Sequence, residues 1–402
     1  MKIILIFCSL MVVFVSNAQV GQSPNQLEEA SAKSESEITI LNLSGMNLIE
    51  VPDSVRKYSN LRILNLADNK ITSLPKYLKK LTHLEEINLS NNQIQSSKFK
   101  APRLKNLERL NLSRNALAEL PKRFTKFKNL RFLGLDENEF TKLPMGVKKY
   151  KSIESLSICQ NNLVFFGENF RHFKRLKSFQ FFEAAGSNIS QVPENISYLR
   201  RLKRLTLDNN KIVSLSKEIG QLTELEVLEL HKNSLKEIPP ELTSCTKLFL
   251  ITLQQNQLRR LPEGFAKFTD LSALFLNDNK IESLPDDLGN LNLTEVYLQN
   301  NKLTSLPESF KNLDSLVHIR VDKTYLSEFP SQLYGLNSIK SINFTDTDIS
   351  VLPEKILEFD SLEQLAFREA KIDFYDSRNN NYDFIMATLY NRGVKLFIID
   401  YE

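Results

Sequence analysis

The chain has 402 residues, of which 42% are hydrophobic and 25% charged, and its formal net charge is +4. This composition fits a protein with a continuous core, and so small a net charge gives no sign of nucleic-acid binding through overall charge. Only three cysteines are present, so a fold held together by many disulfides is excluded.

The N-terminus has the features of a secretory signal peptide. Lys2 precedes an apolar run from Ile3 to Val15, and the small residue Ala18 ends the segment. A membrane anchor is the alternative, but the run is short for a bilayer span. Residues 19–36 are polar and predict a flexible leader. We therefore expect an exported protein, located in the periplasm, on the cell surface or in the medium, without a transmembrane segment after signal removal.

Residues 38 to about 380 repeat one pattern, L-x-x-L-x-L-x-x-N-x-L-x-x-L-P, as in "LRILNLADNKITSLP" (residues 61–75). Such a period is the strongest indicator of architecture that a sequence can offer. Nearly all units begin at one constant interval, but the step from Leu271 to Leu293 is one residue shorter. We place an insertion in a longer step, between Leu176 and Leu202. The fifteen units begin at Ile38, Leu61, Leu84, Leu107, Leu130, Ile153, Leu176, Leu202, Leu225, Leu248, Leu271, Leu293, Leu316, Ile339 and Leu362.

Each unit predicts a strand followed by a helical turn. Segments such as "LNL" alternate with period two, whereas the part after the proline spaces apolar residues three apart. Stacked units would form an α/β solenoid, a horseshoe with a parallel concave sheet and short helical turns on the convex side. Asparagine amides can pair the backbone groups left at the sharp turn after each strand. This structural ladder comprises Asn69, Asn92, Asn115, Asn138, Asn161, Asn210, Asn233, Asn256, Asn279 and Asn301, with departures at Met46, Thr324, Thr347 and Ala370.

The pattern resembles the leucine-rich repeat family and is similar to the repeat type of Ras-group-related and bacterial members. The resemblance implies protein–protein interaction as the default activity. Many extracellular animal members carry cysteine-rich caps, and this sequence does not, which favours a bacterial source. After signal cleavage only Cys159 and Cys245 remain, several units apart, so no disulfide is expected.

The end of the chain predicts a cap for the last unit. Asp383 to Asn391 fits a short helix that Gly393 stops, and Val394 to Asp400 fits a final strand. The expected organisation is therefore a signal peptide (1–18), a leader (19–36), a leucine-rich repeat solenoid (37–382) and a helix–strand cap (383–402).

The sequence contains no constellation for catalysis, and we expect no enzyme activity, cofactor or metal. The four histidines fall in different units, with no phosphate loop and no Cys/His metal spacing. Asp208 and His231 occupy the same slot of neighbouring units, which favours a solvated polar pair.

Two surfaces are candidates for binding. On the concave side, apolar and aromatic residues gather in consecutive units where the repeat expects polar ones, which favours a contact with a protein partner. On the convex side, basic residues form a stripe for an anionic glycan or membrane surface, or simply a solvated face. The concave patch comprises Val227, Leu250, Phe275, Tyr297, His318 and Arg320; the basic stripe comprises Lys122, Arg123, Lys126, Lys148, Lys149, Arg171, Arg175, Arg200 and Arg201.

Two isolated phenylalanines are weaker candidates. Phe132 lies on a strand, and we place Phe182 at the rim, in the insertion within "FEAAGSN", where it either contacts a partner or closes the gap. The sequence thus predicts an exported, monomeric recognition protein; a structural role in the envelope stays open.

Overall fold

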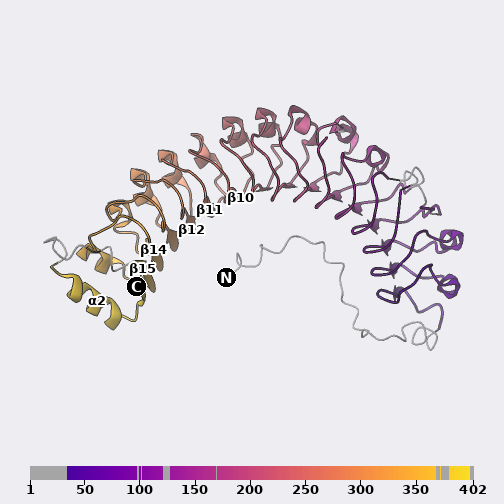
Figure 1. Cartoon of the computed structure of the whole chain (residues 1–402), viewed down its shortest axis with the longest axis horizontal. Helices are drawn as coiled ribbons and strands as arrows, with labels where there is room; N and C mark the ends of the chain where they lie inside the picture. Colours follow the sequence, from indigo (N-terminus) through magenta and orange to yellow (C-terminus); the bar gives the residue numbers. More distant parts are fainter. Residues whose placement is uncertain are drawn as a thin grey trace.

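The computed structural model describes residues 34–96, 99–100, 102–120, 127–168, 170–367, 372 and 380–398. Over these residues the chain forms an open arc, with strands along its inner side and short turns along its outer side (Figure 1). The expected signal peptide and most of the leader lie outside the described residues, as do Lys122, Arg123 and Lys126 of the basic stripe.

The inner side is one parallel sheet whose strand order follows the sequence from β1 to β16. Strands are short because only the alternating segment of each unit is extended before the chain turns outward. The parallel solenoid expected from the repeat is confirmed. The strands are β1 (Ile40–Asn42), β2 (Ile63–Asn65), β3 (Glu86–Asn88), β4 (Arg109–Asn111), β5 (Phe132–Gly134), β6 (Ser155–Ser157), β7 (Phe181–Glu183), β8 (Arg204–Thr206), β9 (Val227–Glu229), β10 (Leu250–Thr252), β11 (Ala273–Phe275), β12 (Glu295–Tyr297), β13 (His318–Arg320), β14 (Ser341–Asn343), β15 (Gln364–Phe367) and β16 (Lys395–Ile398).

The outer side consists of short 3₁₀ turns. Prolines such as Pro52 and Pro307 precede many of them, and each turn buries an apolar residue against the sheet. Gly289 lies where neighbouring turns approach so closely that a Cβ atom would collide with the Ser309 backbone. The turns are η1 (Asp53–Lys57), η2 (Lys76–Lys80), η4 (Met145–Lys149), η5 (Phe170–Arg175), η6 (Glu194–Leu199), η7 (Lys217–Gln221), η8 (Pro240–Ser244), η9 (Phe265–Lys267), η10 (Asp286–Asn290), η11 (Glu308–Asn312), η12 (Ser331–Leu333) and η13 (Glu354–Glu358).

The asparagine ladder ties each unit to the one before it. Asn256 Nδ2 donates to the carbonyls of Leu230 (3.0 Å) and Leu253 (3.0 Å), and Asn256 Oδ1 accepts from Leu235 N (3.0 Å). The residue before it, Gln255, has a left-handed backbone (φ 58) that creates the sharp turn. These contacts agree with the structural role predicted for the ladder.

Hydroxyl groups replace the amide at several ladder positions. Thr324 Oγ1 donates to Val321 O (2.6 Å), and Thr347 Oγ1 donates to Phe344 O (2.8 Å). A hydroxyl has one proton and cannot bridge as many carbonyls as an amide. In these two units the threonine donates to a carbonyl of its own unit.

The predicted position of the insertion is wrong. Phe182 pairs in register with Leu156, so it occupies the core position of its unit, and that unit begins at Phe179 rather than Leu176. Strand β6 begins at Ser155, β7 at Phe181 and β8 at Arg204, so the longer step leads into β7 and the next step has the ordinary length. The extra residues therefore lie before β7, in the outer part of the preceding unit that contains η5.

Phe182 is correspondingly no rim residue, and the prediction that it contacts a partner is wrong. Its side chain is 0% exposed. Its ring stacks on Phe166, with centroids 5.9 Å apart, and meets Phe170, Phe173 and Phe179 at 6.0–6.4 Å. The longer turn thus brings additional rings that fill the space beneath it.

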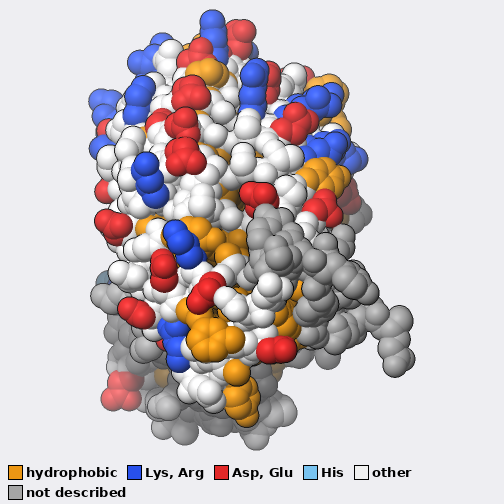
Figure 2. Space-filling view, turned by 90° about the vertical axis from the view of Figure 1, so that its left-hand side faces the viewer, with side chains coloured by type: hydrophobic (Ala, Val, Ile, Leu, Met, Phe, Trp, Pro, Cys, Tyr) orange, Lys and Arg blue, Asp and Glu red, His pale blue; other side chains and the backbone are white. Residues whose placement is uncertain are grey.

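At the C-terminal end, helix α2 (Tyr382–Asn391) packs beside η13, and Gly393 (φ 79) follows it. β16 then pairs in parallel with β15. This end exposes several aromatic side chains, including Phe384 and Tyr390. Viewed from the C-terminal side, hydrophobic side chains gather at the lower end, below a surface of mixed charges (Figure 2). Within the described residues no helix has both the length and the apolar character needed to cross a bilayer.

Candidate functional site

The concave face is built from the outward-pointing residues of the short strands. Because neighbouring strands are parallel and in register, equivalent residues of successive units form rows across the sheet. One row runs through Thr252, Phe275, Tyr297, Arg320 and Asn343. The binding character of this face therefore changes from unit to unit along the row.

An aromatic pair occupies the middle of that row. The rings of Phe275 and Tyr297 stack with centroids 5.3 Å apart and planes 8° from parallel. Both side chains are partly exposed. Tyr297 Oη donates to Glu295 Oε2 (2.8 Å), and burial followed by this hydrogen bond raises the pKa of Tyr297 to about 12. The phenol is therefore a fixed neutral group at neutral pH, and its ring is held beside that of Phe275.

The other predicted members of the concave patch differ in accessibility. Leu250 and His318 are partly exposed, and Arg320 forms a double contact with Asp322 (Nε–Oδ1 and Nη2–Oδ2, both 3.1 Å). Val227 is only 7% exposed, so the prediction that it offers a contact surface is wrong. It lies between β8 and β10, whose side chains cover it on both sides.

Phe132 lies apart from this patch, on β5 in the N-terminal half of the sheet. It is partly exposed, and the Arg109 guanidinium carbon lies 4.8 Å from its ring centroid. This cation–π contact gives the ring a structural partner on the neighbouring strand.

A pair of carboxylates near the centre of the face was missed by the sequence reasoning. Asp136 Oδ1 accepts from Ser157 Oγ (2.5 Å) and from Cys159 N (2.7 Å). Glu183 lies on the other side of Ser157; burial, then the charge of Asp136, raise the pKa of Glu183 to about 7, while Arg204 opposes the shift. One hydroxyl thus lies between two acids that are unfavourable to ionise together.

Asp208 and His231 lie side by side, as their slots suggested, with His231 Nδ1 2.7 Å from Asp208 Oδ1. Asp208 Oδ1 also accepts from His231 N (2.8 Å), so its carboxylate is tied to the turn. On nearby strands Arg204 Nε lies 3.3 Å from Glu229 Oε2. Among the described residues no group of three His, Cys, Asp or Glu side chains is arranged to hold a metal ion.

On the outer side, the described members of the basic stripe are all exposed and lie on or just after three consecutive turns. Lys148 and Lys149 end η4, Arg171 and Arg175 belong to η5, and the pair Arg200 and Arg201 follows η6; contacts between η4, η5 and η6 place them on one continuous surface.

The repeat, the parallel inner sheet and the asparagine ladder define a leucine-rich repeat solenoid. The profile described as "Leucine-rich repeat region" matches residues 49–191 and 163–291, and the one described as "Leucine Rich Repeat" matches residues 292–313. The chain belongs to the leucine-rich repeat family. No curated protein matches the sequence.

Several solved structures resemble most of the chain. The LRR protein LIC12759 of Leptospira interrogans is 25% identical, with a TM-score of 0.77 over 93% of this chain and 98% of that chain. A plant peptide hormone receptor, RGFR1 in complex with RGF2, is 26% identical, with a TM-score of 0.64 over 82% of this chain and 56% of the receptor. An internalin of Listeria monocytogenes shares the fold, at 18% identity and a TM-score of 0.57, over 94% of this chain and 95% of that chain.

Proposed function

We propose that this protein is an exported, non-catalytic recognition protein that binds a protein partner on its concave face. The observation that carries the proposal is the stacked, partly exposed pair of Phe275 and Tyr297 on a sheet surface that is otherwise mainly polar. Aromatic side chains are enriched among the residues that contribute most to binding energy.

The surroundings of the pair fit the anatomy of a binding surface. Leu250 extends the apolar surface on one side, and the Arg320–Asp322 pair borders it on the other. The Tyr297–Glu295 hydrogen bond already holds one ring in the free protein, so less conformational entropy is lost when a partner binds. A rigid apolar centre with a polar border is typical of protein interfaces.

The likeness to other leucine-rich repeat proteins supports the class of activity. The receptor RGFR1 was solved in complex with RGF2, and the Leptospira protein matches this chain over nearly its full length. Lys2 and the apolar run that follows it support export, and the lack of cysteine-rich caps in the sequence supports a bacterial source.

The test is site-specific photocrosslinking in the source cells. A photoreactive phenylalanine analogue replaces Phe275 in one variant and Phe384, an exposed ring on α2, in the control. We expect a discrete protein adduct from position 275 that disappears when Tyr297→Ala is added. Equal adducts from both positions, or none from position 275, would remove the concave pair as the binding site.

A further inference from the structure

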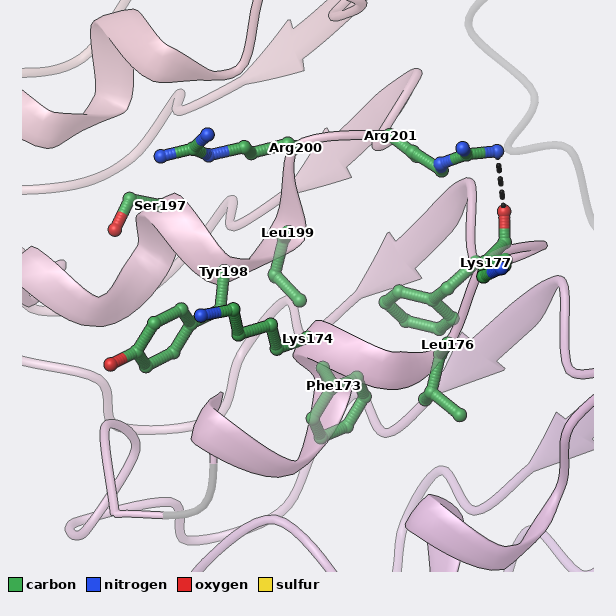
Figure 3. A pocket seen from close by; sticks show the side chains of 10 residues that line it. Phe173, Lys174, Leu176, Lys177, Ser197, Tyr198, Leu199, Arg200 and Arg201 are labelled. Carbon is green, nitrogen blue, oxygen red and sulfur yellow. Dashed lines mark hydrogen bonds between the residues drawn. The ribbon is translucent and has the colours of Figure 1, made fainter.

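The outer surface holds a cavity of about 310 Å³ between η5 and η6 (Figure 3). These two turns are longer than the other described turns, and η5 belongs to the unit with the insertion. The cavity is at the lower end of the size range of small-ligand sites. It lies on a different surface from the concave face, so what it binds is independent of the function proposed above.

The floor of the cavity is apolar. Phe173, Leu176, Phe179 and Leu199 line it and belong to the core, each 5% exposed or less. Tyr198, which is 38% exposed, stands at one side. The cavity can therefore accept an apolar or aromatic group of a ligand.

Four cationic side chains surround this floor: Lys174, Lys177, Arg200 and Arg201. No carboxylate is among the described residues that line the cavity, and none of the four cations belongs to an ion pair of the described part of the chain. Elsewhere on the solenoid cations pair between neighbouring units, as Lys203 does with Glu226 at 2.9 Å. The cavity thus concentrates positive charge that no ion pair of the described residues neutralises.

The four cations are held differently. Arg201 Nη1 donates to Lys177 O (3.1 Å), the bond drawn in Figure 3, so Arg201 links the two turns. Arg200 Nη2 donates to the side chain of Gln221 (2.9 Å), and Lys174 Nζ lies 5.7 Å from the Tyr198 ring centroid. Lys174 and Arg200 can therefore turn to a ligand without breaking a described bond to the main chain.

The pKa of a neighbouring histidine reflects the positive electrostatic potential of this surface. The pKa of His172 on η5 is lowered, first by burial and then by the charges of Lys148, Arg171 and Arg175. Positive charge on η4 and η5 thus disfavours a further cation on this surface, and the same field attracts an anion.

We propose that this cavity binds a small phosphate or sulfate monoester. Lys174 and Arg200 hold the tetrahedral anion, and the apolar body of the ester lies on the floor formed by Phe179 and Leu199. Charge-assisted hydrogen bonds of this kind are about twice as strong as neutral ones, and the apolar floor distinguishes an ester from the free anion.

Phenyl phosphate, phenyl sulfate, inorganic phosphate and phenol are the probes, titrated against the full mature protein by calorimetry. We expect both esters to bind more tightly than inorganic phosphate and phenol. When the pH is lowered from about 7.5 to about 5, the affinity for phenyl phosphate should fall, because its second ionisation lies near pH 6 and the dianion takes up a proton. The affinity for phenyl sulfate should not change over this range. Phenol binding as tightly as the esters would overturn the proposal.

The decisive variant is Lys174→Gln with Arg200→Gln, and its matched control is Lys148→Gln with Lys149→Gln on η4. Both variants remove two exposed positive charges and so lower the net charge of the protein by the same amount. If net charge alone attracted the ester, its binding would weaken equally in the two variants. We expect about tenfold weaker ester binding in the first variant and about twofold or less in the control. Equal losses in the two variants would show nonspecific attraction and overturn a defined site.

Binding to vesicles of phosphatidylcholine with phosphatidic acid tests whether the phosphate monoester is a lipid headgroup rather than a free small molecule. Retention by the wild type and the control, with loss in the Lys174→Gln/Arg200→Gln variant, supports the site with a lipid headgroup as ligand. Retention that the two double variants lose equally overturns it. Thermal melting of both variants, expected to match the wild type, excludes misfolding as the cause.

Discussion

Phe182 stacks on Phe166 across the longest unit of the solenoid, with ring centroids 5.9 Å apart and planes 7° from parallel. The two residues come from successive units, since Phe182 belongs to β7 and Phe166 precedes η5. The longer turn therefore packs over a cluster of buried aromatic rings, and the core beneath it remains filled.

Replacing Phe182 by alanine should destabilise the protein by about 3–5 kcal/mol, because it leaves a large cavity among buried rings. Phe181→Ala is the matched control, since Phe181 is the adjacent residue on the partly exposed face of the same strand. Urea unfolding of both variants measures the difference. A smaller loss for Phe182→Ala than for Phe181→Ala would contradict the register of β7.

Asn256→Ala should lower the free energy of unfolding by about 2 kcal/mol or more, because it leaves buried backbone groups of two units without partners. Arg260→Ala, at an exposed position nearby, should change it little. Urea unfolding followed by circular dichroism provides the comparison. An unchanged midpoint for Asn256→Ala would argue against the ladder as a stabilising element.

Glu183 makes the free energy of unfolding depend on pH. An acid whose pKa is raised in the folded state, here to about 7 from 4.5, stays protonated on folding while the unfolded chain ionises. The folded state then binds more protons, so the free energy of unfolding falls as the pH rises from about 4.5 to 7.

Glu183→Gln should therefore stabilise the protein at about pH 8, by about 1–3 kcal/mol, and have little effect at about pH 4. Glu282→Gln, which changes an exposed carboxylate, is the control. Thermal melting at the two pH values tests this. Equal effects of Glu183→Gln at both would mean that the ionisation of Glu183 is not the cause.

Cys159 and Cys245 should react slowly with a chromogenic disulfide reagent in the native protein and rapidly in urea. Both are free thiols; burial raises the pKa of both, that of Cys245 to about 12, so little thiolate forms at about pH 8. Gel mobility should be the same with and without reductant. Rapid labelling of the native protein would show that one thiol is accessible.

The repeat allowed most of the fold to be predicted, because each unit specifies its own strand, turn and ladder contact. The register of one unit could not be fixed in the same way. Leu176 and Phe179 both fit the start of the unit, because apolar residues stand three and five places after each of them. The pairing of Phe182 with Leu156 decides in favour of Phe179.

The concave row was predictable from strand alternation, but its accessibility was not. Neighbouring strands cover a short side chain such as Val227, whereas the longer Tyr297 reaches past them. The acids Asp136 and Glu183 were missed because they belong to two different units and meet at Ser157 of the unit between them. The error in register also moved Glu183 off the sheet.

The strict order of the sheet from β1 to β16 has a mechanical consequence. A force applied to the two ends of the chain acts along the stack, and each unit is held mainly by the unit on either side. Units should then peel away one at a time from an end, each releasing roughly 75–80 Å of extended chain. The extension of the chain under force should therefore increase in equal steps, and the number of steps gives the number of units that have unfolded.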